Sequence, residues 1–381
     1  MCSILGIINF KDSTSGITQD VLNDMRKTTA HRGPDQNGFF RSESVCFGHN
    51  RLAVIDVEHG LQPMTVVFEG NTYTIVYNGE IYNAVELRQE LISSGVSFST
   101  HCDTEVVLYS YIIWGTACSD KLNGIYAFAI YDEKNKRVYL SRDRMGVKPF
   151  FYTQVGNSFI FSSEVKAILK HPQVKAELNS EGIWQLLYLS PMRPSNNGIF
   201  KNIYEISPGY HGIFDADGLR LYKYWSLEAY ELEDDEDKIL DKTRFLLTDA
   251  IQRQLVSDVP LCTFLSGGLD SSIVSSVARS DEKFGHQLST YSFEYEGNKE
   301  HFEATSFQPE SDDAYASWLA NYLKTDHTIL TVGQQKIADL LTDAVKFRDY
   351  PGMADIDSSL LYYCREVKNR HTVALSGECY I

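Results

Sequence analysis

The chain has 381 residues, which is too long for one ordinary domain and sufficient for two that each bury a core. Its formal net charge of −16 argues against a nucleic-acid partner. Seven unevenly spaced cysteines without a CxxC pair favour neither a disulfide framework nor a zinc site, and they indicate a reducing, cytoplasmic setting. The sequence has no secretory leader and no apolar run of about 18 residues, so we expect neither export nor a membrane partner.

Cys2 becomes the amino-terminal residue if Met1 is removed. A thiol beside its own α-amine is a nucleophile and a base in one residue, because that amine has a pKa of about 7.7–8.0. The apolar run over residues 3–10 predicts a buried strand that fixes this terminus. Position alone is weak evidence for catalysis, so the interpretation of Cys2 depends on the residues that follow.

The following segments alternate apolar runs with polar loops. We expect a helix at 18–29, a loop with special backbone angles at 31–35 and a strand at 48–56 with Arg51 near its start. A strand at 72–77 should run into a glycine turn, and a helix should open at 101–105. Four strands are expected at 124–131, 137–141, 150–153 and 158–162, followed by a helix from about 163. These elements favour stacked sheets with helical layers outside.

Five residues of this half form a chemically sensible set, namely Arg51, Asn78, Gly79, Glu80 and Asp103. An arginine binds a carboxylate bidentately, two acids hold an ammonium group, and an amide with a glycine N–H stabilises an oxyanion. Those groups suit the binding of free glutamine and cleavage of its side-chain amide. Each also has an ordinary explanation: a surface ion pair for Arg51, a hairpin turn for Asn78 and Gly79, and a helix cap for Asp103.

The motifs MCSILGI, HRGPDQNG, RLAVIDV, YNGEIYN, CDTEV, LNGIYAFAIYD and SRDRMGVKPFFY occur in this order. Together they resemble the class II glutamine amidotransferase domain of the N-terminal nucleophile family. That resemblance implies a four-layer αββα sandwich, with Cys2 as nucleophile and Arg51 on the glutamine α-carboxylate. It also implies that Glu80 and Asp103 hold the α-ammonium and that Asn78 and Gly79 form the oxyanion hole.

The second half carries a separate signal. The apolar run at 260–265 predicts a buried strand, residues 266–272 (SGGLDSS) a tight turn, and residues 273–279 a helix. Such a strand, loop and helix start aim backbone N–H groups and a positive dipole end at one anion. The loop matches neither GxxxxGK[ST] nor GxGxxG. It resembles the PP-loop of ATP pyrophosphatases, which implies that Asp270 helps to hold Mg²⁺.

Apolar runs at 288–295 and 371–375 predict further parallel strands, hence a doubly wound sheet with its ligands at the carboxyl ends. An amidotransferase domain followed by a PP-loop domain resembles the glutamine-hydrolysing asparagine synthetase family. The resemblance implies that ATP is a co-substrate and that Glu378 is a catalytic acid or base near the acyl-adenylate. The ATP site it implies contains Leu265, Ser266, Gly267, Gly268, Asp270, Ser271, Ser272, Phe293, Ser376 and Gly377.

We expect an amidotransferase domain at 1–205, a connecting hairpin at 206–232 and a synthetase domain at 233–381. The chain departs from the family at its end, where residues 379–381 replace a small residue and an acidic pair, and residues 350–359 lack an expected arginine. We therefore expect the second domain to be C-terminally incomplete, and a chain of this length to hydrolyse glutamine but make little asparagine.

The sequence interpretation is glutamine-dependent asparagine synthesis from glutamine, aspartate and ATP. One alternative keeps this chemistry and changes the acceptor carboxylate. A second is a glutaminase-only or glutamine-sensing protein. Sugar-phosphate and ribosyl-amine amidotransferases share the first half, but they lack SGGLDSS, so these two classes are set aside. The oligomeric state stays open, with a homodimer as one alternative.

Overall fold

The computed structural model describes residues 1–11, 19–189, 194, 196–232, 235–303 and 313–377. It divides into two compact units, residues 1–229 and 230–381, and each is described by itself below. Within the described ranges no helix combines the length and the apolar character needed to cross a membrane.

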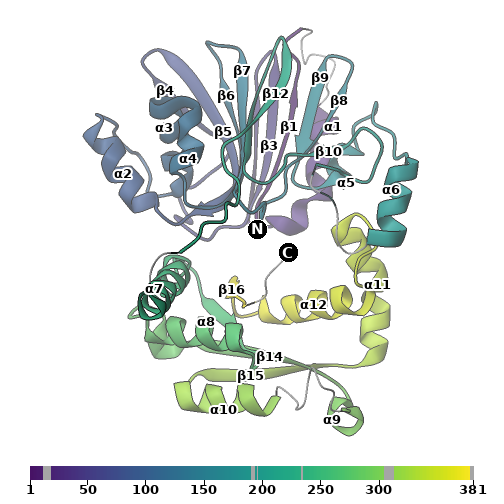
Figure 1. The fold of residues 1–381 in the computed structure, drawn as a ribbon. Helices are drawn as coiled ribbons and strands as arrows, with labels where there is room; N and C mark the ends of the chain where they lie inside the picture. The colour runs from purple at the N-terminus through teal and green to yellow at the C-terminus, as the bar shows by residue number, and fades with distance from the viewer. Residues whose placement is uncertain (12–18, 190–193, 195, 233–234, 304–312, 378–381) are drawn as a thin grey trace. The chain divides into compact units, whose positions relative to one another are not determined.

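Two six-stranded antiparallel sheets form the first unit (Figure 1). The first sheet has the order β10-β8-β9-β1-β3-β2, with β10 Tyr204–Glu205, β8 Phe151–Val155, β9 Ser158–Ser162, β1 Ser3–Ile8, β3 Val45–Arg51 and β2 Gln36–Arg41. The second has the order β12-β11-β7-β6-β5-β4, with β12 Gly218–Lys223, β11 Tyr210–Asp215, β7 Arg137–Arg142, β6 Gly124–Asp132, β5 Asn71–Ile81 and β4 Met64–Phe68.

Helices cover the outer face of each sheet. Those of this unit are α1 Gln19–Thr28, α2 Ala84–Ser93, α3 Asp103–Trp114, α4 Cys118–Lys121, α5 Val165–Ile168 and α6 Ser180–Trp184. The strand β1 shows the reason for the layering: Ile4 and Ile8 pack toward the other sheet, while Leu5 and Ile7 pack against α1 and α5. Because both faces are buried, β1 is a continuous apolar run.

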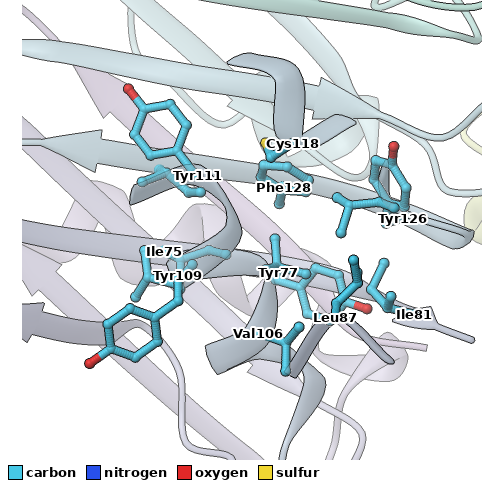
Figure 2. Close-up of a cluster of buried hydrophobic side chains, with 14 of the residues drawn as sticks. Ile75, Tyr77, Ile81, Leu87, Val106, Tyr109, Tyr111, Cys118, Tyr126 and Phe128 are labelled. Atoms are coloured by element: carbon cyan, nitrogen blue, oxygen red, sulfur yellow. The ribbon is translucent and has the colours of Figure 1, made fainter. Parts of the chain in front are cut away.

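The second sheet packs against α2, α3 and α4. Figure 2 shows this core, in which Ile75, Tyr77 and Phe128 of the sheet meet Val106 of α3 and Leu87 of α2. The layer order is helix, sheet, sheet, helix, so the predicted αββα sandwich is confirmed.

Two predicted strand boundaries were wrong, and the hairpin expected in the connecting segment belongs to the second sheet. The strand predicted at 48–56 is β3, which ends at Arg51. The expected turn at 78–80 lies inside β5, because pairing with β6 continues as far as Ile81. The hairpin expected within the connector 206–232 is formed by β11 and β12, and β11 pairs with β7 as part of the second sheet.

A four-stranded parallel sheet organises the second unit, in the order β15-β14-β13-β16. Its strands are β13 Leu261–Phe264, β14 Ser289–Tyr295, β15 Asp326–Val332 and β16 Val373–Leu375. The helices are α7 Glu236–Arg253, α8 Leu269–Ser280, α9 Asn298–His301, α10 Asp313–Leu323, α11 Gln334–Arg348 and α12 Ala354–Val367.

Helices lie on both faces of this sheet. On one face Leu261 packs with Ala278 of α8 and Leu265 with Ala316 of α10. On the other face Cys262 packs with Val367 of α12. This confirms the doubly wound arrangement. The strand order reverses between β13 and β16, and in such sheets ligands bind outside the carboxyl ends at that point.

Candidate functional site

Cys2 is held at the entrance to β1 by two neighbouring segments. The backbone nitrogen of Leu52 donates to Cys2 Sγ over 3.4 Å, and Sγ lies 3.6 Å from the carbonyl oxygen of Leu52. The Nε atom of Arg32 donates to the carbonyl oxygen of Cys2 over 2.9 Å. Contacts with Leu52 and Arg32 therefore hold Cys2 in addition to its connection to β1.

Burial controls the ionisation of the terminus. It lowers the pKa of the Met1 α-ammonium to about 5, assisted by the positive charges of Arg32 and Lys148. Burial also raises the pKa of the Cys2 thiol, against the opposing effect of the terminal ammonium, Lys148 and Arg51. The Met1 amine is therefore neutral at pH 7.

Glu164 binds the side chain of Arg32. Its Oε1 accepts from Arg32 Nη1 over 2.9 Å and lies 3.2 Å from His31 Nε2, while its Oε2 accepts from Lys166 Nζ over 2.6 Å. Burial opposes ionisation, but the His31 hydrogen bond and the charges of Arg32 and Lys166 lower the pKa of Glu164 to about 2. This ionised carboxylate fixes the arginine that holds Cys2.

Arg51 is buried rather than in a surface ion pair, with 4% of its surface exposed. Its Nη1 donates to Gln36 Oε1 over 2.7 Å and to the carbonyl oxygen of Val57 over 2.9 Å. Its Nη2 donates to the carbonyl oxygens of Ile55 and Asp56 over 2.9 and 2.7 Å. The guanidinium therefore shapes the 55–57 turn, and a contact with the glutamine carboxylate stays a prediction.

Asn78 and Gly79 lie side by side within β5. The Nδ2 atom of Asn78 is buried and has no hydrogen-bond partner in the described part of the chain, which is rare for a buried amide. A Cβ atom at Gly79 would lie 2.7 Å from the Cα of Tyr126, so only glycine fits there. An unused buried donor is what an oxyanion hole requires before its substrate arrives.

Besides burial, the negative charge of Asp103 acts on Glu80 and raises the pKa of that carboxyl group. Asp103 opens α3, but Cys102 is the cap residue, and Asp103 Oδ2 accepts from the Tyr77 hydroxyl over 2.6 Å and from the Ile81 nitrogen over 3.0 Å. Burial raises the pKa of Asp103 against those hydrogen bonds. Burial likewise raises the pKa of Glu80, while Lys148 opposes the shift. Two neighbouring acids suit an ammonium ligand.

The sequence reasoning missed two residues of this site, Arg32 and Lys148. Both lie in motifs that were noted, but their burial depends on contacts from distant segments. A basic residue inside an otherwise apolar or glycine-rich motif was the available signal.

The loop after β13 has the geometry that a phosphate-binding turn requires. Gly267 has a φ of +92°, which favours glycine. The hydroxyls of Ser266 and Ser271 lie 2.9 Å apart, and the Ser272 hydroxyl donates to the Gly268 carbonyl oxygen over 2.7 Å. The loop is thereby fixed at the amino end of α8, where backbone N–H groups and the helix dipole favour an anion.

The end of β16 meets this loop. A Cβ atom at Gly377 would lie 2.5 Å from the backbone nitrogen of Ser271. A pocket of about 520 Å³ opens there, lined by eight of the predicted ATP residues: Leu265, Ser266, Gly268, Asp270, Ser271, Phe293, Ser376 and Gly377. Gly267 and Ser272 belong to the same loop and helix start without lining the pocket, and Glu378 lies outside the described residues.

Seven further residues line this pocket and were not predicted: Phe264, Tyr291, Ser292, Glu294, Tyr295, Asn298 and Asp313. Four of them belong to β14, and Asn298 lies beyond its carboxyl end. Among the described residues no group of three or more His, Cys, Asp or Glu side chains could hold a metal ion. Asp270 lines the pocket with a carboxylate, a group that suits a Mg²⁺ ion whose other ligands come from phosphate and water.

Two family models match successive parts of the chain. The family model described as "Glutamine amidotransferase domain" matches residues 1–225, and the model described as "Asparagine synthase" matches residues 242–379. Glutamine-hydrolysing asparagine synthetase 3 of Bacillus subtilis is 47% identical over the whole chain. A provisionally named glutamine-hydrolysing asparagine synthetase of Methanocaldococcus jannaschii is 34% identical over 99% of the chain. The chain spans 62% of the first relative's length and 74% of the second's.

Among solved structures, the glutamine phosphoribosylpyrophosphate amidotransferase of Bacillus subtilis aligns with 72% of this chain and 62% of its own, at 18% identity and a TM-score of 0.45. The family assignment depends on the sequence matches instead. The chain belongs to the glutamine-hydrolysing asparagine synthetase family.

Proposed function

We propose that the protein synthesises asparagine in two coupled reactions. Glutamine hydrolysed at Cys2 gives glutamate and ammonia. ATP converts the aspartate side chain into a β-aspartyl adenylate with release of pyrophosphate, and ammonia displaces AMP from that adenylate to give asparagine. The observation that carries the proposal is the presence of a partly buried thiol at the second residue and an unused buried amide donor in one unit, and of a strand-loop-helix pocket in the other.

In the first reaction the α-amine of Cys2, freed by removal of Met1, accepts the thiol proton. The sulfur attacks the side-chain amide carbon of glutamine, and the oxygen becomes negatively charged. Asn78 Nδ2 and the Gly79 N–H stabilise that oxygen. Ammonia leaves with the proton returned by the amine, and water then hydrolyses the thioester to glutamate. Arg51 binds the α-carboxylate of glutamine, and Glu80 with Asp103 binds its α-ammonium.

In the second reaction the loop of residues 266–272 and the start of α8 hold the ATP phosphates. Asp270 would hold Mg²⁺, which neutralises phosphate charge when bound. Phe264 and Phe293 provide an apolar wall for the nucleotide, with ring centroids 4.8 Å apart. Glu378 acts as acid or base near the adenylate. The six described cysteines are free thiols, which supports a cytoplasmic location.

A panel of carboxylic acids tests this function. The full-length protein is mixed with ATP, Mg²⁺, glutamine and one acid, and AMP, pyrophosphate and the new amide are measured together. Aspartate is expected to give all three in equal amounts. An amide formed faster from another carboxylate would replace the proposed acceptor, and glutamate release without AMP for any acid would contradict the ligase function.

A further inference from the structure

Lys148 ends a loop whose backbone is fixed at several points. The backbone nitrogen of Lys148 donates to Asp143 Oδ2 over 3.0 Å, and the carbonyl oxygen of Lys148 accepts from Arg142 Nε over 2.8 Å. Asp143 Oδ1 also accepts from the nitrogens of Met145 and Val147, over 3.1 and 2.9 Å. The direction in which the Lys148 side chain leaves the backbone is therefore defined by the loop itself.

The side chain of Lys148 ends in a buried amine that has no direct partner. Only 7% of the residue is exposed, and its Nζ makes no hydrogen bond or ion pair with any described residue. Burying a cation in this way is costly unless negative charge forms nearby. Burial lowers the pKa of the Lys148 amine, and the charges of Glu80 and Cys2 oppose that shift. A buried amine without a direct partner does not stabilise the fold, which indicates a function for it.

The charged groups around Lys148 identify its location. They are Glu80 of β5, Arg32 of the 3₁₀ helix Ala30–Arg32, the Cys2 thiol and Asp143. Lys148 is in turn among the groups whose charge acts on the terminal amine, on Cys2 and on Glu80. Asp143 Oδ2, which accepts from the backbone nitrogen of Lys148, also accepts from the nitrogen of Tyr126 over 3.1 Å, and Tyr126 pairs with Gly79 of β5. The loop that carries Lys148 therefore lies beside the part of β5 that carries Asn78, Gly79 and Glu80.

We propose that Lys148 is a positioning residue of the glutaminase site, which acts through the Cys2 sulfur by stabilising its thiolate and the negative charge that develops as the sulfur attacks glutamine. The proposal rests on the role of Cys2 as nucleophile. Glu80, with which Lys148 forms no ion pair, remains available for the glutamine ammonium. Arg32 and Arg51 are already engaged with Glu164 and with the 55–57 turn, so Lys148 is the uncommitted cation facing the thiol among the described residues.

The thiol itself provides the test, because its alkylation needs no glutamine. Protein with a processed amino terminus, verified by mass, reacts with iodoacetamide between pH 5 and pH 10. Modification of the Cys2 peptide is followed by mass spectrometry, which separates it from the exposed Cys364. The variants are Lys148→Met, Lys148→Gln and Lys148→Arg. Lys121→Met is the matched control, since Lys121 pairs with Glu90 at the surface.

We expect both uncharged variants to shift the alkylation profile of Cys2 upward by roughly one pH unit, so that the rate at pH 7 falls about tenfold. Lys148→Arg and Lys121→Met should retain the wild-type profile. An unchanged profile in Lys148→Met, or an equal shift in Lys148→Arg, would overturn the proposal. The proposal would also be overturned if Lys148→Met and Lys148→Gln both failed to fold while Lys148→Arg folded, because the charge would then be required for folding. Failure of the proposed function gives a different result, namely a normal alkylation profile without glutamate release.

Discussion

Arg32 joins the nucleophile to a distant carboxylate: its Nε donates to the carbonyl oxygen of Cys2 and its Nη1 to Oε1 of Glu164, each over 2.9 Å. Glu164 follows β9, so the position of the terminal thiol depends on a residue 162 positions later in the sequence. This relationship explains how a free chain end is held rigidly enough for catalysis.

Glu164→Gln should lower the free energy of unfolding by roughly 2–3 kcal/mol at pH 7. The folded-state pKa of Glu164 is lowered from 4.5 to about 2, so its stabilisation is fully present above pH 4.5 and disappears as the pH falls toward 2. Urea unfolding at pH 7 and pH 3 measures this, and the difference from wild type should shrink at pH 3. Glu177→Gln, an exposed control, should change stability by less than about 1 kcal/mol. A pH-independent loss in Glu164→Gln would contradict the ionised pair.

Asn78→Ala should lower kcat for glutamine hydrolysis by about 10²–10³, because it removes a donor aimed at the developing oxyanion. Its KM should change little, since that donor acts mainly in the transition state. Thermal unfolding should show only a small change, because Nδ2 makes no hydrogen bond in the described structure. A variant with normal kcat would exclude Asn78 from the oxyanion hole.

Arg51→Ala should raise the KM for glutamine, since a charge-assisted hydrogen bond contributes on the order of 1.5–3 kcal/mol. It should also destabilise the first unit, because four hydrogen bonds to Gln36 and the 55–57 turn are lost. Steady-state kinetics and thermal unfolding separate the two effects. A loss of stability with an unchanged KM would make Arg51 purely structural.

Asp270→Asn should impair AMP formation and leave glutamine hydrolysis measurable, because the two sites use separate residues. The Mg²⁺ concentration needed for half-maximal AMP formation should rise. Ser280→Ala, at the opposite end of α8, is a control that should keep wild-type behaviour. If the Mg²⁺ dependence of Asp270→Asn were unchanged, the metal role of that carboxylate would be refuted.

The layers of the fold could be predicted because the motifs and the long apolar runs of β1, β6 and β13 are strong local signals. The segment Asn78–Gly79 was predicted as a turn, since those residues favour one locally. Tertiary pairing with β6 overrides that preference and extends β5 through the site. The edge strand β15 was missed because six of its seven residues are exposed or only partly buried, which weakens the apolar pattern.

The site residues divide in the same way. Cys2 and Asp270 could be proposed from the sequence, because the resemblance of the motifs that contain them implies a role for each. Arg32 and Lys148 could not be assigned, because the burial of a basic side chain depends on groups contributed by segments that are distant in the sequence. The structure adds the surroundings of every predicted residue that it describes.

The central claim is that a thiol in the first unit only supplies ammonia to a reaction in the second. The variant Cys2→Ala tests this claim most directly. Asparagine formation is measured in the full-length protein with ATP and aspartate, once with glutamine and once with an ammonium salt, alongside glutamate release. The variant should lose glutamate release and glutamine-dependent synthesis while it retains synthesis from ammonium. Loss of both syntheses in a folded variant, or persistence of glutamine-dependent synthesis, would contradict the division of labour between Cys2 and the ATP pocket.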